Sequence, residues 1–270
     1  MNELERKEYI KNGLKEHFNY IKDDYDVLYI AVQGSQNYNL DTYTDTYKSD
    51  IDTKAIILPS IDNFIKNTKP ISTTLVLPNS EHCDIKDIRV MFDTFKKQNV
   101  NFIEILFTEY NIVNPDYVDL FYPIIKNREN IAHLNINQTL RCICGMSMEK
   151  YNALERMYPN CVDDINNYGY SRKQYHHIAR MNDFVKKYIK PNVGYEDCLI
   201  PSDLNSLMDI KVNPKPLEEV RIKAKEMNEE TYKIAHEHIT EVDTVNNEAI
   251  DILENVKYNI LRSKFKKELV

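Results

Sequence analysis

Apolar residues recur at spacings of three and four near the start of the chain. They are separated by Lys, Glu and other polar residues. This period predicts an amphipathic helix over residues 4–21 that packs one face on a sheet. The positions on that face are Leu4, Tyr9 or Ile10, Leu14, Phe18 and Ile21.

The pattern then changes to short apolar runs bounded by turn residues. Residues 26–33 and 50–58 are rich in Val, Ile, Leu and Tyr, which predicts two buried strands. The polar segment 36–49 between them predicts a long loop. A helix-capping Ser60 predicts a short helix after the second strand, and residues 73–77 predict a further strand.

Helical periods dominate the rest of the chain. We expect a helix from Asp84 through Phe95, a second short helix over 102–106, and a first layer that closes near residue 135. The helices expected beyond it span 136–158 and 171–190, then a short segment capped by Ser202, then 215–241 and 243–264.

These elements predict an α+β fold, with a small mixed sheet flanked by helices and followed by an all-helical C-terminal layer. We expect two domains, residues 1–135 and 136–270. A chain of 270 residues with 42% hydrophobic and 29% charged residues is typical of a folded protein.

Charge and cysteine usage narrow the classes of function. A formal net charge of −7 argues against a broad phosphate-binding surface, although it allows a local basic groove. The N-terminus lacks the pattern of a secretory signal, and no run of about 18 apolar residues occurs. We therefore expect a cytoplasmic protein with no membrane partner. Five cysteines without a C-x-x-C pair predict reduced core thiols rather than disulfides or a zinc site.

The sequence places two carboxylates on one predicted strand. Side chains at i and i+2 of a strand share a face, so Asp50 and Asp52 are expected to project together. Such a pair repels, and a divalent cation between the carboxylates removes this cost. The spacing predicts a site for Mg²⁺ or Mn²⁺.

A candidate phosphate-binding turn, Gly34-Ser35, directly follows the first predicted strand. Glycine permits positive φ and a close approach of the backbone to phosphate, while a serine hydroxyl and nearby amides can donate to phosphate oxygens. Mg²⁺ prefers a few carboxylate oxygens together with triphosphate oxygens and water. The order strand, Gly-Ser, strand, Asp-x-Asp therefore indicates a site for a metal-bound nucleoside triphosphate.

With these motifs, the chain resembles the DNA polymerase beta-like nucleotidyltransferase superfamily, in particular its bacterial and phage branch of predicted nucleotidyltransferases. The superfamily signature is Gly-Ser at the end of one strand and Asp-x-Asp on the next. Three further segments match the branch and extend the resemblance over most of residues 26–225. They are Tyr38 and Leu40 after Gly-Ser, Asn101 with Glu104-Ile105-Leu106-Phe107, and Lys173, His177 and Arg180 in helical register.

The resemblance implies transfer of a nucleoside monophosphate from a nucleoside triphosphate such as ATP to an acceptor hydroxyl. Asp50 and Asp52 would bind the catalytic metals, and a third carboxylate would activate the acceptor. Asp84 is the residue we assign to this third role and, with Asp50 and Asp52, to the metal site, although Glu81 and Asp87 lie nearby in the sequence. The acceptor stays open between an RNA end, a protein and a small molecule.

A basic stripe is expected on the helix over 171–190. Lys173, His177 and Arg180 follow at spacings of four and three and so share one helix face, which Lys187 extends. We assign Lys173, His177 and Arg180 to nucleotide binding, with a solvated helix face as the alternative. Glu104 is interpreted as a residue that caps or pairs locally.

Two other readings stay open. The chain could be a nucleotide-binding or partner-binding module that keeps the fold without the activity, for example one half of a two-component defence system. It could also be a glycosyltransferase that uses Asp-x-Asp for Mn²⁺ and a sugar nucleotide, a reading that the upstream Gly-Ser turn disfavours.

Overall fold

The computed structural model describes residues 1–44 and 48–269. By contacts the chain divides into two compact units, which are described separately. Unit 1 is Met1–Leu134 with Val245–Val270, and unit 2 is Asn135–Thr244. Part of the loop predicted over 36–49, residues 45–47, lies outside the described residues.

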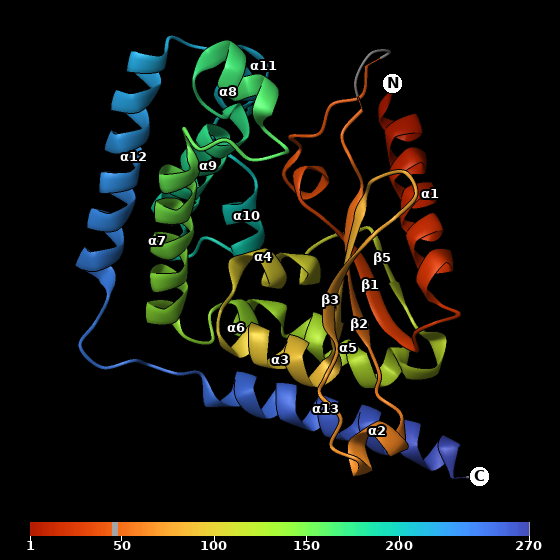
Figure 1. The fold of residues 1–270 in the computed structure, drawn as a ribbon. Coiled ribbons are helices and arrows are strands. Elements are labelled where there is room, and N and C mark those ends of the chain that lie inside the picture. The colour runs from red at the N-terminus through yellow and green to blue at the C-terminus, as the bar shows by residue number, and fades with distance from the viewer. Residues whose placement is uncertain (45–47, 270) are drawn as a thin grey trace. The chain divides into compact units, whose positions relative to one another are not determined.

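Unit 1 contains a mixed sheet and the helices around it (Figure 1). Its strands are β1 (Val27–Gln33), β2 (Asp52–Ile57), β3 (Ser72–Val76), β4 (His82–Asp87) and β5 (Asn111–Val113). Its helices are α1 (Glu3–Ile21), α2 (Ile61–Ile65), α3 (Ile88–Lys96), α4 (Val100–Ile103), α5 (Val118–Lys126), α6 (Arg128–Ala132) and α13 (Asn247–Glu268). Three 3-10 turns complete it: η1 (Ser35–Tyr38), η2 (Glu104–Leu106) and η3 (Pro115–Tyr117).

The five strands lie in the order β3-β4-β2-β1-β5. The β2–β4 pair is parallel, while β1–β2, β1–β5 and β3–β4 are antiparallel. Strand β1 is apolar and lies between β2 and β5, and it is buried along most of its length. The mixed sheet with its helices confirms the predicted α+β fold.

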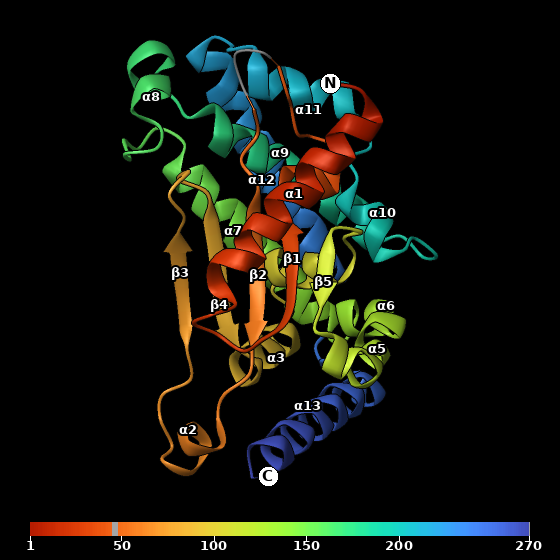
Figure 2. The ribbon, with the colours of Figure 1, turned by 90° about the vertical axis from the view of Figure 1, so that its right-hand side faces the viewer.

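Helix α1 covers one face of the sheet, and Figure 2 shows it crossing the strands. A capping box between Asn2 and Glu5 begins the helix. Its apolar stripe is buried against alternate residues of β1, β2 and β4, which confirms the predicted amphipathic helix but not the predicted position of Leu4, whose side chain is 76% exposed in the first turn. Members of this core include Ile10, Leu14, Ile21, Ile30, Val32, Ala55, Ile57, Cys83 and Ile85.

The segment after residue 81 differs from the sequence prediction. Asp84 and Ile85 belong to strand β4, and the helix begins only at Ile88. Buried Cys83 and Ile85 continue a strand period, and the Asp87 carboxylate caps α3 by accepting from the Arg89 amide. The helix that was predicted from Asp84 is therefore wrong at its start, because cross-strand pairing sets the end of β4.

Unit 2 is helical. Its helices are α7 (Ile136–Ala153), α8 (Val162–Tyr168), α9 (Arg172–Tyr188), α10 (Tyr195–Leu199), α11 (Leu204–Val212) and α12 (Leu217–His238). Helices α7, α9 and α12 pack against one another. The short helix predicted to begin at Ser202 is α11, whose cap is Asp203 because its carboxylate accepts from the Ser206 amide.

Helix α13 contacts α3, α5 and α6 and groups with unit 1. The sequence division into 1–135 and 136–270 placed this helix in the helical half, and that division stays a prediction. The apolar stripe of a helix shows that one face is buried, but it does not identify the neighbour. Within the described residues, no helix has the length and apolar character needed to cross a bilayer.

Candidate functional site

The Gly34-Ser35 turn begins where β1 ends. Gly34 has φ 89°, in the left-handed region that favours glycine, and Ser35 opens the 3-10 turn η1. The last residue of β1, Gln33, pairs with Asp52, the first residue of β2. Antiparallel pairing of β1 and β2 therefore brings the Gly-Ser turn next to the start of the Asp-x-Asp strand.

Asp52 and Asp84 lie on one face of the sheet. In the parallel register, Thr53 pairs with Cys83 and Lys54 pairs with Asp84. Cys83 lies in the core under α1, so the alternating side chains of Asp52 and Asp84 lie on the opposite face. The structure thus brings the Gly34-Ser35 turn, Asp52 and Asp84 to neighbouring positions.

Asp50 differs from its predicted position within a strand. Strand β2 begins at Asp52, and exposed Asp50 precedes it, while Ile51 between them is 1% exposed. The backbone carbonyl of Asp50 accepts a hydrogen bond from Gln36 Nε2 at 2.7 Å. Gln36, just after the Gly-Ser turn, is therefore hydrogen-bonded directly to the Asp-x-Asp segment.

Asp52 and Asp84 accept hydrogen bonds from neutral or weakly basic groups. Asp52 Oδ1 accepts from the His82 amide at 2.9 Å and lies 3.4 Å from His82 Nδ1. Asp84 Oδ1 accepts from the Thr74 hydroxyl. Across the described ranges 1–44 and 48–269, no three His, Cys, Asp or Glu side chains are arranged as a set of metal ligands.

The donor chemistry of Asp52 and Asp84 nevertheless fits Mg²⁺. This ion takes one or two protein carboxylates and completes its shell with water and triphosphate oxygens. Asp52 retains 36% side-chain exposure, so solvent and a ligand can reach it. These two residues, with Asp50, are the ones that would hold such a cation.

Sequence reasoning missed the role of Glu104. Its Oε1 accepts from the Gly34 amide at 3.1 Å, across 70 positions of the sequence, and the residue is 2% exposed. Glu104 thus contacts a distant part of the chain, and the prediction that it caps or pairs locally was wrong. Helical spacing shows only neighbours within an element, so no local signal could identify this contact.

Two lysines share the face of the sheet that carries Asp84. Lys54 pairs with Asp84 in the register, and Lys86 follows it on β4 at i+2. Their ammonium groups lie 4.7 and 4.9 Å from the ring centre of Phe102. Positive charge beside the carboxylates could bind phosphate oxygens.

The segment after Gly34 is secured to α1 by ion pairing. Arg6 donates to both carboxylate oxygens of Asp41 at 2.7 Å and to the Gln36 carbonyl at 3.2 Å. The hydrogen bonds to Asp41 raise the pKa of Arg6 above its ordinary value. A bidentate guanidinium–carboxylate pair of this kind fixes the start of the loop in a defined position.

Lys173, His177 and Arg180 all lie on α9, in unit 2, whereas the other predicted site residues lie in unit 1. Lys173 is exposed and Arg180 is 5% exposed. Burial, reinforced by the Arg180 charge, holds the pKa of His177 well below its usual range. His177 is therefore neutral at pH 7, and its assignment to nucleotide binding stays a prediction.

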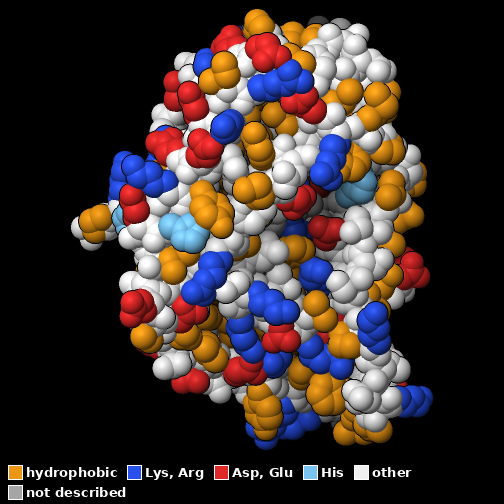
Figure 3. Space-filling model, turned by 60° about the vertical axis from the view of Figure 1, so that its left-hand side comes forward, with side chains coloured by type: hydrophobic (Ala, Val, Ile, Leu, Met, Phe, Trp, Pro, Cys, Tyr) orange, Lys and Arg blue, Asp and Glu red, His pale blue; other side chains and the backbone are white. Residues whose placement is uncertain are grey.

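Lys187 does not extend the basic stripe. Its ammonium donates to the carbonyls of Asp197 and Ile200 and pairs with Asp183 at 3.0 Å. These contacts secure the segment after α9 within unit 2. On the face shown in Figure 3, Lys and Arg side chains are interspersed with Asp and Glu side chains, as expected for an acidic chain with many local pairs.

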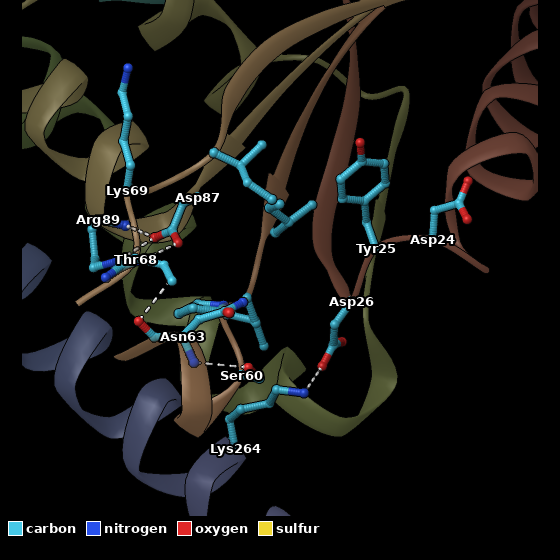
Figure 4. A pocket seen from close by; sticks show the side chains of 14 residues that line it. Asp24, Tyr25, Asp26, Ser60, Asn63, Thr68, Lys69, Asp87, Arg89 and Lys264 are labelled. Atoms are coloured by element: carbon cyan, nitrogen blue, oxygen red, sulfur yellow. Dashed lines mark hydrogen bonds and ion pairs between the residues drawn. The ribbon is translucent and has the colours of Figure 1, made fainter. Parts of the chain in front are cut away.

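A cavity of about 230 Å³ lies at the other end of β2 (Figure 4). Its lining includes Ile57, Asp87, Arg89, Asp26 and Lys264, and none of the predicted site residues. Four of the charged groups that line it form two ion pairs, Arg89 with Asp87 and Lys264 with Asp26. We interpret this cavity as a stabilising feature of the fold.

Comparisons with known proteins gave one finding. The chain matches no protein-family model and no curated protein. It is similar to a solved nucleotidyltransferase-like protein from Exiguobacterium sibiricum, at 12% identity and a TM-score of 0.26, over 94% of this chain and 75% of that one. Similarity at this level establishes neither a shared fold nor a shared function.

Proposed function

We propose that this protein is a metal-dependent nucleotidyltransferase that transfers a nucleoside monophosphate from a nucleoside triphosphate to a hydroxyl acceptor. The observation that carries the proposal is the pairing of Gln33 with Asp52. It places a Gly-Ser turn beside a carboxylate at the start of the next strand, with Asp84 on the same face. Resemblance to the superfamily motifs supports the assignment.

In this proposal, the backbone and hydroxyl of Ser35 donate to the terminal phosphates, and Asp50 and Asp52 hold the cation. The bound Mg²⁺ or Mn²⁺ supplies charge neutralisation for the triphosphate. Asp84 takes the proton of the acceptor hydroxyl, whose oxygen forms a bond to the α-phosphorus. The bond from the α-phosphorus to the bridging oxygen breaks, and pyrophosphate leaves.

The first test is thermal unfolding with each nucleoside triphosphate, with and without Mg²⁺ or Mn²⁺. A ligand at about a hundred times its dissociation constant stabilises a protein by about 2.7 kcal/mol, which raises the midpoint by several degrees for a chain of this size. We expect a metal-dependent rise in the wild type and none in the Asp50→Asn, Asp52→Asn double variant. A rise that the double variant retains would contradict the assigned site.

The second test is activity. With the preferred triphosphate and metal, pyrophosphate release should require an acceptor drawn from RNA ends, proteins or small hydroxyl compounds. The Asp84→Asn variant should bind the triphosphate but release pyrophosphate more slowly. Binding without pyrophosphate release from any acceptor class would argue for a nucleotide-binding module instead.

One observation favours a second candidate, a partner-binding module that keeps the fold without the nucleotide. The Gly34 amide already donates to a buried carboxylate, Glu104, at the turn where a phosphate would bind. If this contact excludes nucleotide, the wild type should bind none and Glu104→Ala, which removes the accepting oxygens, should gain binding. Equal nucleotide binding by both proteins would exclude that role for Glu104.

A further inference from the structure

A buried polar cluster lies on the α1 side of the sheet, behind the Asp-x-Asp segment. His17 from α1, Thr53 from β2 and Glu81 before β4 are 0%, 0% and 8% exposed. His17 Nδ1 lies 2.8 Å from Thr53 Oγ1, and His17 Nε2 lies 3.0 Å from Glu81 Oε2. Buried polar groups are costly unless they are hydrogen-bonded, so these contacts hold the three side chains in fixed positions.

Glu81 also reaches the backbone between the two aspartates. Its Oε1 accepts from the Ile51 amide at 2.8 Å. Its other oxygen accepts from Asn79 Nδ2 at 2.6 Å as well as from His17. One carboxylate thus accepts three N–H donors from three different parts of unit 1.

The proton positions in this cluster follow from the chemistry of the donors and acceptors. A carboxylate only accepts, so His17 Nε2 must carry a hydrogen. With Nε2 donating to Glu81, Nδ1 is the ring nitrogen that pairs with the Thr53 hydroxyl. This arrangement pairs both ring nitrogens of His17, the Thr53 hydroxyl and both Glu81 oxygens at once.

Ile51 is held by its side chain as well as by its amide. The side chain is 1% exposed and lies against Gly13 of α1, where an added Cβ would clash with Ile51 Cδ1. Two independent contacts from behind the sheet therefore fix the residue between Asp50 and Asp52. With Ile51 directed into the core, Asp52 is directed to the opposite face.

We propose that Glu81, oriented by His17 and Asn79, is a positioning residue that fixes the backbone of residues 50–52 so that the aspartates can bind a divalent cation. The proposal rests on the proposed function for the identity of the bound ion. Outer-shell hydrogen bonds to metal-binding segments typically contribute 10- to 100-fold in metal affinity, as an order of magnitude. Glu81 contacts no substrate in this scheme.

The test compares Glu81→Gln with Asp87→Asn in the full-length chain. Asp87 is the matched control, because its buried carboxylate also accepts a backbone amide and a basic side chain, at the other end of β4. Affinity for Mn²⁺ alone is measured by electron paramagnetic resonance. We expect Glu81→Gln to weaken it by about 10- to 100-fold and Asp87→Asn to leave it unchanged. Equal losses, or no loss in Glu81→Gln, would overturn the proposal.

A second measurement tests, independently of any metal, whether Glu81 holds the backbone at Ile51. In Glu81→Ala, which removes both accepting oxygens, the Ile51 amide should exchange its hydrogen faster, and the Nε2–H signal of His17 in nitrogen-15 spectra should change. Unchanged Ile51 exchange would show that Glu81 does not hold the segment. The wild type could bind no Mn²⁺ while exchange of the Ile51 amide still depended on Glu81. In that case the proposed function would fail, but Glu81 would still be shown to hold the backbone at Ile51.

Discussion

The acidic residues at the two ends of strand β2 differ in their ion pairing. At the Ile57 end, Asp87 accepts from Arg89 Nε and Nη2 at 2.9 and 2.6 Å, and Lys264 pairs with Asp26. At the Asp52 end, Asp52 and Asp84 form no ion pair with a Lys or Arg anywhere in the described residues. The same sheet thus contains paired carboxylates at one end and carboxylates without a strong cationic partner at the other.

This difference separates a stabilising role from a binding role. A carboxylate held by a bidentate arginine is already neutralised, and it has little to gain from a cation. Neighbouring carboxylates without such a partner repel each other and gain from a divalent ion. At the Asp52 end, the buried glutamates hold backbone amides instead, Glu104 at Gly34 and Glu81 at Ile51. They hold the motif in place without neutralising its aspartates.

The largest effect is expected from neutralising both aspartates on the exposed face. The Asp52→Asn, Asp84→Asn double variant should lose the whole stabilisation by metal and triphosphate, about 2.7 kcal/mol at a hundredfold excess over the dissociation constant. Its stability without ligand should change by only about 0.5 kcal/mol, because neither group has a cationic partner to lose. Urea unfolding with and without ligand measures the ligand-induced stabilisation and the stability of the free protein. A large loss without ligand would mean that these aspartates are structural.

At the Ile57 end of β2, a substitution should lower the stability of the protein without ligand and leave the ligand-induced stabilisation unchanged. Asp87→Ala removes the α3 cap and leaves Arg89 without its acid, which should cost about 2 kcal/mol. Ligand-induced stabilisation should remain as in the wild type. Chemical denaturation gives the cost, and Asp87→Asn, which keeps a capping oxygen, should lose less. A matching loss of ligand response would indicate that the two ends are coupled.

A glycine comparison tests the turn itself. Gly34→Ala should destabilise the protein by about 1–2 kcal/mol, because φ 89° is strained for alanine even though no atom lies within 4 Å of the added Cβ. The control is Gly145→Ala, at an exposed position of helix α7 with equally open space, which should gain up to about 1 kcal/mol. Thermal unfolding of both variants measures the contrast. Equal behaviour would show that the Gly34 conformation is not required.

The smallest expected effect is a pH dependence at Glu81. Burial alone would raise the pKa of Glu81, but hydrogen bonds from His17, the Ile51 amide and Asn79 lower it below the ordinary 4.5 on balance. A lowered folded-state pKa stabilises the fold above the unfolded pKa, and this contribution is lost as pH falls through the folded value. Between pH 5 and pH 3, the wild type should therefore lose more stability than Glu81→Gln. Parallel stability profiles would contradict the ionised hydrogen-bonding role.

Local pattern determined much of the fold of this protein. The three-to-four period up to Ile21 gave α1, and the apolar run that stops at Gly34 gave β1 to within a residue. These elements depend on spacing, capping and turn residues within a short stretch of chain, which a sequence displays directly. The same reasoning placed Gly34 and Ser35 directly after the first strand and Asp52 near the start of the second.

Only the tertiary structure decided which segments meet. The start of α3 was misjudged because Ile85 fits either period, and pairing of Ile85 with Ala55 on β2 keeps it in a strand. The contacts of Glu104 with Gly34 and of His17 with Glu81 join residues 70 and 64 positions apart. Such contacts depend on strand order and helix packing, which bring distant segments together and leave no period in the sequence. For this reason, the chain by itself indicated the carboxylates and the turn, whereas the buried groups that hold them in place emerged only from the fold.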